Sequence, residues 1–176
     1  MLPPITVRPT TEDDWERVRT LRLENASDNP VSYGATAAYA RRMTEEDWRL
    51  RARRGEGPTT TSLMALETTT GRPVGMMSAQ QGDDDGPDPV LTGVYVSPAF
   101  RGRTAGVADT LLQGIVLWAV GRGETLRLYV DDQATPAQRF YARHGFAATG
   151  RERASRLLGD DPDATPRRLL ELSRPL

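Results

Sequence analysis

The sequence predicts an α/β fold in which helices pack on a mixed β-sheet, and three kinds of segment carry that prediction. Apolar and polar residues alternate over 125–130, which is the period of a strand. Apolar residues recur at helical spacing over 106–120, between an Arg/Gly-rich loop and two glycines. Gly-, Pro- and Asp-rich segments separate the elements. The 176 residues contain no repeat and no long linker, so we expect residues 1–176 to form a single domain.

The first half of the chain is expected to contribute a strand, two helices and a hairpin. Thr11 and the acidic residues after it begin the first helix, because a side-chain oxygen and negative charge stabilise a helix N-terminus. Thr44 precedes a similar acidic run at the second helix. The expected elements are a strand at 5–8, helices at 11–27 and 44–54 with a loop or broken helix at 28–40, and hairpin strands at 62–67 and 73–80.

The second half is expected to alternate strands and helices before two closing strands. Gly93 interrupts a strand at 90–96 and indicates a bulge or a close backbone approach. Thr135 is expected to cap a helix that has Pro136 in its first turn. The other expected elements are a solvated loop at 82–88 with three aspartates, a helix at 106–120, a strand at 125–130, the end of the 135 helix at Gly145, and strands at 146–149 and 169–173 around a charged loop at 151–166.

Composition excludes several classes of function. A formal net charge of −1 leaves no overall basic field for nucleic acid. The absence of cysteine excludes disulfides, thiolate catalysis and zinc–thiolate sites, and one histidine, His144 at an expected helix end, cannot build a histidine metal cluster. No apolar run approaches the about 18 residues of a membrane span, and the N-terminus lacks a signal pattern. We therefore expect a cytoplasmic protein without a metal, nucleic acid or membrane.

An Arg/Gly-rich loop between a strand and a helix predicts an anion site. The apolar strand ends near Pro98, and residues 101–106 read Arg-Gly-Arg-Thr-Ala-Gly before the helix. Amide groups of such a loop can converge on one ligand, the helix dipole adds about half a positive charge, and an arginine can close over the ligand. The sequence therefore points to a ligand that carries phosphate. Because no Gly-Lys-Ser/Thr follows the loop, a nucleotide-phosphate enzyme of another fold is disfavoured.

The order of elements and two motifs together resemble the GNAT superfamily of acyl-CoA-dependent N-acyltransferases. The pyrophosphate loop of that family, Gln/Arg-x-x-Gly-x-Gly/Ala, is matched by Arg-Thr-Ala-Gly-Val-Ala at 103–108. Its tyrosine helix, which commonly ends Tyr-x-x-x-Gly-Phe, is matched by Tyr-Ala-Arg-His-Gly-Phe at 141–146. The two motifs stand in the family's order, with a helix and a strand between them. The resemblance covers nearly the whole chain and implies a mostly antiparallel sheet with splayed central strands.

The resemblance implies acetyl-CoA as the cosubstrate and assigns its binding residues. Main-chain amides of the 103–108 loop would hold the pyrophosphate, and Gly106 would allow a positive φ and a close approach. Main-chain groups of 94–96 would pair with the pantetheine arm as an added strand does, and an amide there would polarise the thioester carbonyl. The expected coenzyme-binding residues are Val94, Tyr95, Val96, Arg101, Gly102, Arg103, Thr104, Ala105, Gly106, Val107 and Ala108.

Tyr141 is the expected catalytic residue, as the general acid that protonates the departing thiolate. A free tyrosine has a pKa of about 10 and a thiol about 8.5, so full proton transfer is uphill by about 2 kcal/mol. The alternative is a core aromatic side chain beside Phe140 whose hydroxyl is satisfied by the protein. Tyr33 is the expected acceptor contact, because the segment between the first two helices borders the acceptor site in GNAT proteins.

Three departures from the family pattern leave the phosphate-binding arginine and the catalytic base open. The loop appears two residues longer than usual, so either Arg101 or Arg103 is expected over the phosphates. Ala134 stands where many relatives have an asparagine that contacts the coenzyme arm, and Val90 where many have a glutamate base. The remaining candidates for the base are Asp88, Glu67, Tyr95 and a chain of water molecules.

The sequence therefore predicts an N-acetyltransferase that moves acetyl from acetyl-CoA to a primary amine. Direct transfer in a ternary complex is expected, because no cysteine is available for an acyl-enzyme. The acceptor stays open between a small-molecule amine and a peptide N-terminus, and the resemblance also implies a homodimer. The alternative is a non-catalytic module of the same fold that binds or senses acyl-CoA, which the missing glutamate favours.

Overall fold

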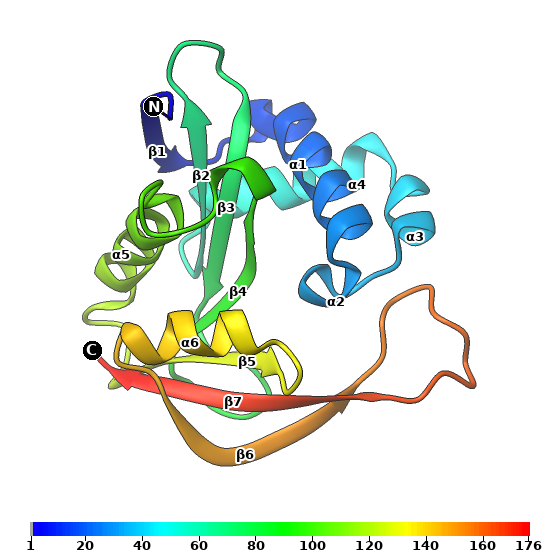
Figure 1. The fold of residues 1–176 in the computed structure, drawn as a ribbon, viewed down its shortest axis with the longest axis vertical. Coiled ribbons are helices and arrows are strands. Elements are labelled where there is room, and N and C mark those ends of the chain that lie inside the picture. The colour runs from blue at the N-terminus through cyan, green and yellow to red at the C-terminus, as the bar shows by residue number, and fades with distance from the viewer. Residues whose placement is uncertain (1) are drawn as a thin grey trace.

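Seven strands form one mixed sheet in a computed structural model that describes residues 2–176 (Figure 1). The strand order is β1-β2-β3-β4-β5-β7-β6, and every neighbouring pair is antiparallel except the parallel pair of β4 and β5. The predicted mixed, mostly antiparallel sheet is confirmed. The strands are β1 (Ile5–Pro9), β2 (Thr60–Glu67), β3 (Pro73–Gln80), β4 (Val90–Val96), β5 (Thr125–Asp131), β6 (Ala147–Ser155) and β7 (Arg167–Pro175).

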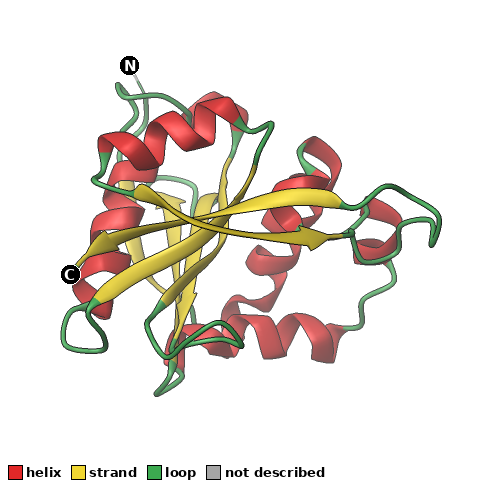
Figure 2. Ribbon diagram, turned by 90° about the horizontal axis from the view of Figure 1, so that it is seen from below, coloured by secondary structure: helices red, strands yellow, loops and turns green. Residues whose placement is uncertain are grey.

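Helices cover both faces of the sheet, as Figure 2 shows. On one face, α5 (Val107–Ala119) packs on β2 and β3, and α6 (Thr135–Arg143) contributes Tyr141 to the same apolar core. On the other face, α1 (Trp15–Asp28) and α4 (Glu45–Ala52) pack on Met64 and Met76, because side chains of a strand alternate between faces. The shorter elements are α2 (Pro30–Tyr33), α3 (Ala37–Arg41) and the 3₁₀ turns η1 (Glu12–Asp14), η2 (Arg53–Glu56) and η3 (Pro98–Phe100).

The central strands splay apart, as the resemblance implied. β4 and β5 share one register position, Val90 opposite Arg127, next to a 2.9 Å hydrogen bond from the Arg127 amide to the Pro89 carbonyl. Beyond that point the two strands separate (Figure 1). Gly93 has φ 57° at the place where the β3–β4 register shifts, so the predicted bulge is confirmed. Only Val90 of β4 therefore pairs with β5, and residues 91–96 of β4 do not.

The charged segment at 151–166 is not all loop, which corrects one sequence prediction. β6 continues to Ser155 and β7 begins at Arg167. β6 is an edge strand, exposed along all but its last residue, so it carries no alternation of apolar and polar residues. Main-chain pairing with β7 forms the strand instead, supported by an ion pair between Glu152 and Arg168 across the two strands.

Thr135 does not cap α6, which corrects a second prediction. It is the first residue of the helix, and Ala134 before it supplies no side-chain hydrogen bond. Pro136 lies in the first turn as predicted. The Gln138 side chain instead donates to the carbonyls of Asp131 and Asp132, at 3.0 and 3.1 Å, and so joins α6 to the end of β5.

Asp14 connects the first strand to the first helix. Its carboxylate, 2% exposed, accepts two hydrogen bonds from Arg8 at 2.7 and 2.8 Å and one from Arg17 at 3.0 Å. The Thr11 amide donates a fourth, also at 3.0 Å. Hydrogen bonds from Arg8 above all hold the pKa of Asp14 well below its usual range. The ionised carboxylate therefore favours the folded chain.

We expect Asp14→Asn to lower the free energy of unfolding at pH 7 by about 2 kcal/mol, the scale of hydrogen bonds to a charged group. Because the folded-state pKa is lower than the unfolded-state value of about 3.9, the stabilisation is complete above that value and is lost as pH falls below it. Urea unfolding of both proteins at pH 7 and pH 3 measures this. A difference that stays constant or grows at pH 3 would contradict the assignment.

Candidate active site

The loop between β4 and α5 presents a free helix N-terminus. Gly106 has φ 64° and ends the loop, and the first hydrogen bond of the helix runs from the Thr110 amide to the Gly106 carbonyl at 3.0 Å. The three amide groups of 107–109 therefore have no acceptor within the helix. Residues 101–104 are exposed, and no atom lies within 4 Å of the place where a Cβ of Gly102 would be. This open, electropositive end of a 13-residue helix fits a phosphate group.

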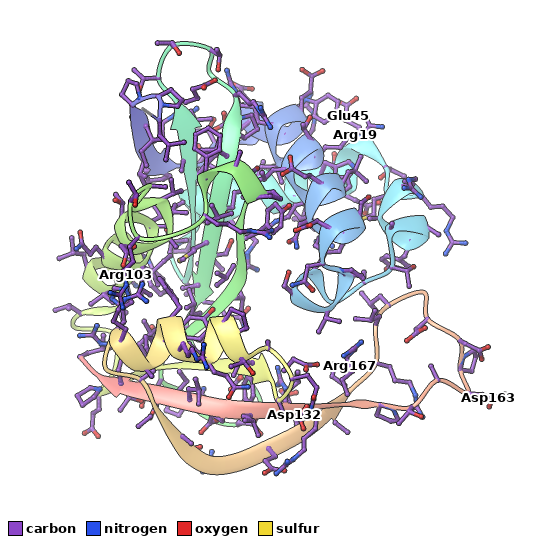
Figure 3. All side chains as sticks on the ribbon, in the orientation of Figure 1. Arg19, Glu45, Arg103, Asp132, Asp163 and Arg167 are labelled. Carbon is purple, nitrogen blue, oxygen red and sulfur yellow. The ribbon has the colours of Figure 1, made fainter. Side chains whose placement is uncertain are left out.

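The two arginines of this loop make different contacts. Arg101 donates through Nε to the Val96 carbonyl at 2.8 Å, forms an ion pair with Asp28 of α1, and lies over the Tyr95 ring. Arg103 is exposed and has no ion pair or side-chain hydrogen bond among residues 2–176. In Figure 3 its side chain is seen between α5 and α6. Arg101 therefore joins the loop to α1, whereas Arg103 is available to a ligand.

Tyr141 lies in the core under α6 with a hydroxyl that no described residue satisfies. Its side chain is 6% exposed, and the rings of Phe140 and Phe146 meet it edge-on at centroid distances of 5.4 and 5.5 Å. Within residues 2–176, no group forms a hydrogen bond with the hydroxyl. Burial raises the pKa of Tyr141 above its usual value, so the phenol stays protonated at neutral pH. The alternative of a core tyrosine with a satisfied hydroxyl therefore does not describe this geometry.

Tyr95 directs its hydroxyl at two carboxylates that the sequence analysis did not identify. It donates to Glu24 Oε1 at 3.2 Å and to Asp28 Oδ2 at 3.3 Å, both on α1. Burial, and then these two negative charges, raise the pKa of Tyr95, which makes it a poor base. The only sequence signal for the pair was the i, i+4 spacing of two acidic residues on one helix. Negative charge thus lies beside the end of β4.

The two acidic candidates for the base lie outside the opening between β4 and β5. Asp88 accepts hydrogen bonds from the Thr125 hydroxyl at 2.8 Å and the Glu124 amide at 3.1 Å, at the end where the two strands are closest. Glu67 accepts a hydrogen bond from the Thr70 hydroxyl in the turn after β2. It ends β2, and β3 lies between β2 and β4. Val90 is buried at the single pairing position of β4 and β5.

The loop at 82–88 is held to the sheet by Asp83 and Asp85, whereas Asp84 is exposed, so the expectation of solvated aspartates is wrong for Asp83. Arg127 of β5 donates to Asp83 at 2.7 Å and lies 3.4 Å from Glu171 of β7. The Tyr129 hydroxyl bonds Asp85 and donates to Glu171 at 3.0 Å. The reason is long-range, because a buried arginine on β5 attracts the nearest carboxylates and this loop carries them.

Tyr33 and His144 occupy positions that their sequence context only partly predicted. The Tyr33 hydroxyl donates to Met43 Sδ at 3.5 Å, and its ring packs against the apolar cluster around Trp48. His144 follows the last residue of α6, as expected of a helix end, with Nε2 2.8 Å from Asp109 Oδ1 in the first turn of α5. Tyr33 therefore lies on the α1 and α4 face of the sheet, and His144 on the α5 face.

An acyl-CoA-dependent transferase is the class of protein that this site defines. Its features are the splayed strands β4 and β5, the free N-terminus of α5, and the buried Tyr141 of α6. Residues 15–146 match the acetyltransferase (GNAT) family, and the chain belongs to that family. It is an acyltransferase that moves acyl groups from acyl-CoA to amines, with acetyl-CoA as its cosubstrate. No curated protein sequence matches the chain.

Solved structures with the same architecture include acetyltransferases from several kingdoms. NAA60 of Arabidopsis thaliana in complex with a bisubstrate analogue has a TM-score of 0.70 and 17% identity, over 98% of this chain and 99% of that one. A GCN5-related N-acetyltransferase from Kribbella flavida has a TM-score of 0.71 and 23% sequence identity, over 98% of each chain. PaiA N-acetyltransferase of Thermoplasma acidophilum, in complex with coenzyme A, has a TM-score of 0.69 and 16% sequence identity, over 98% of this chain and 99% of that one. At such identities the likeness shows the fold.

No helix within residues 2–176 is long and apolar enough to cross a membrane. No three histidine, aspartate or glutamate side chains in that range are grouped so that they could hold a metal ion.

Proposed function

We propose that this enzyme transfers acetyl from acetyl-CoA directly to a primary amine bound beside the opening between β4 and β5. The observation that carries the proposal is the free N-terminus of α5, which follows the strand that lines this opening after the loop at 97–106. Amides of 107–109 would bind the diphosphate together with Arg103. The segment 94–96 would pair with the pantetheine arm, as a peptide pairs with a sheet edge.

The reaction needs one bond formed, one broken and two protons placed. The neutral amine attacks the thioester carbon, the N–C bond forms, and the C–S bond breaks to release a thiolate. Tyr141 supplies the proton or a hydrogen bond to that thiolate, and solvent protonates the phenolate afterwards. Burial raises the pKa of the Tyr141 phenol, so a hydrogen bond to the thiolate costs less than full proton transfer.

The amine proton leaves on the α1 side of β4. A primary amine with a pKa of about 10.4 is neutral only about once in a few thousand molecules at pH 7. Glu24 and Asp28 place negative charge beside Tyr95, where it attracts the protonated amine. Through water, these carboxylates accept the proton that the ammonium group loses before attack and pass it to solvent, and the second proton, which the nitrogen loses as the amide forms, leaves by the same route. Because the chain has no cysteine, an acyl-cysteine intermediate is excluded and a ternary complex is the proposed route.

Release of free thiol from acetyl-CoA in the presence of a panel of amines tests this function. We expect acceleration by at least one class of primary amine, and a product acetylated on nitrogen. Calorimetric binding of CoA without acceleration by any amine would contradict the proposal and favour a non-catalytic acyl-CoA-binding module.

We expect Arg103→Gln to weaken CoA binding by about threefold to tenfold, the scale of one lost charge-assisted contact at a partly exposed site. Arg101→Gln should weaken it less, because Arg101 is engaged with Asp28 and the Val96 carbonyl. Isothermal titration with CoA measures both. Arg72→Gln is the matched control, since Arg72 is exposed in the turn after β2. Equal dissociation constants for the Arg103 and Arg72 variants would remove Arg103 from the diphosphate site.

A further inference from the structure

Three arginines gather on the α1 and α4 face of the sheet without carboxylate partners. Arg22 of α1 is 6% exposed, and Arg51 and Arg54 at the end of α4 are half-buried. Arg22 donates to the Gly93 carbonyl at 2.8 Å and to Asn25 Oδ1 at 3.3 Å, and both of these acceptors are neutral. Among residues 2–176, no carboxylate forms an ion pair with any of the three guanidinium groups. We call Arg22, Arg51 and Arg54 the arginine cluster.

The positive charge of the arginine cluster has little compensation, because Asp47 of α4 interacts with Arg51 without forming an ion pair. Burial lowers the pKa of Arg22 to about 10, and the charges of Arg51 and Arg54 act in the same direction. Burial and Arg51 also lower the pKa of Arg54. Arg22 and Arg54 nevertheless stay charged at neutral pH. Arg127, the other buried arginine, shows the contrast, because it has two carboxylates against it. Buried charges in folded proteins are paired, so the cluster lacks an anion.

The missing anion would lie near the place where the amine reacts. Gly93, which Arg22 contacts, is the bulge of β4 at the beginning of the opening to β5. Polar residues continue that face of the sheet toward the arginine cluster. The Thr60 hydroxyl donates to the Arg54 carbonyl at 2.9 Å, and Ser78 donates to Ser62 at 2.9 Å. Ser62 and Ser78 are buried, so polar groups and excess positive charge lie on the inner side of this face, next to the proposed acceptor site.

We propose that the arginine cluster binds an anionic group of the acceptor, so that the substrate is an amine that also carries a carboxylate or phosphonate. This inference rests on the proposed acetyl transfer and names the class of its acceptor. Guanidinium groups suit such ligands, because their planar N–H donors match the geometry of carboxylate and phosphonate oxygens. The acidic pair Glu24 and Asp28 lies on the other flank of α1, beside Tyr95, where the ammonium group of the same molecule would approach.

Kinetics with matched acceptors test the proposal. We would compare each α-amino acid with its carboxamide, and aminomethylphosphonate with ethanolamine, at saturating acetyl-CoA. We expect kcat/KM to be about tenfold or more higher for the anionic member of the best pair. In Arg51→Gln/Arg54→Gln the ratio should fall to within about threefold, while CoA affinity is unchanged. Equal rates for both members, a preference for the neutral member, or a ratio that survives the double variant would overturn the inference.

A matched control and a binding measurement separate this inference from the proposed function. Arg19→Gln/Arg72→Gln removes the same charge from exposed positions and should leave the ratio intact. Inorganic phosphate should raise the Tm of the CoA-saturated wild type at constant ionic strength, but not that of Arg51→Gln/Arg54→Gln. If no amine is acetylated although CoA binds, the proposed acetyl transfer is wrong. The shift of Tm with phosphate then tests by itself whether the arginine cluster binds an anion. Equal shifts in all three proteins would then overturn it.

Discussion

Tyr141→Phe is expected to lower kcat by about tenfold or more, the usual contribution of a positioned acid, while the affinity for CoA changes little. The substitution removes one oxygen from a side chain whose ring makes all its protein contacts. Phe140 and Phe146 pack edge-on against that ring in either protein. Because no described residue bonds the hydroxyl, its loss leaves no protein group unsatisfied, and Tm should be nearly unchanged. Thiol release under saturating acetyl-CoA and calorimetry with CoA measure the two parameters.

The pH profile adds a second test of the same assignment. The acid form of Tyr141 is the active one, and burial raises its pKa, so its deprotonation causes no loss of kcat between pH 7 and pH 9. Tyr39→Phe is the matched control, because Tyr39 is a half-buried tyrosine of α3 on the other side of the sheet. A Tyr141→Phe enzyme with wild-type kcat would show that another group protonates the thiolate.

The sequence predicted the local structure of the proposed coenzyme site because its parts are local in the chain. The loop at 101–108 lies between a strand and a helix whose periodicities are clear, and Gly106 adopts the positive φ expected of it. The tyrosine helix is likewise a continuous segment, and Tyr141 falls on its buried face. Splaying of β4 from β5 was available only through the family resemblance, because no local pattern records where two parallel strands stop pairing.

Of the proposed acceptor side the sequence analysis named only Tyr33, because the other contacts join residues far apart in the chain. Arg22 meets Gly93, and Glu24 meets Tyr95, each across a separation of 71 residues. Arg22 also breaks the apolar pattern of a buried helix face, so composition indicates a solvated side chain there. The full length of β6 was not predicted for a related reason. An edge strand with both faces in water has no alternation of apolar and polar residues, and only its pairing with β7 defines it.

Arg127→Leu is expected to lower the free energy of unfolding by about 3–5 kcal/mol, the cost of removing one partner from a buried ion pair. The Arg127 side chain is 7% exposed and contacts Asp83 and Glu171, of which Glu171 is 3% exposed. The variant leaves the Glu171 carboxylate buried beside the hydroxyls of Tyr129 and Thr149, without a cation. Urea unfolding at pH 7 measures the loss.

The double variant Arg127→Leu/Glu171→Leu distinguishes an orphaned charge from lost packing. It should recover part of the loss, because the buried carboxylate is removed together with its cation. Arg153→Leu is the surface control, since Arg153 is half-exposed and 3.9 Å from Asp85, and it should cost under about 1 kcal/mol. A single Arg127→Leu variant as stable as the Arg153 variant would show that the network is solvated.

Because Arg127 also occupies the one position where β4 and β5 pair, loss of the network should widen the opening and weaken CoA binding in the folded variant.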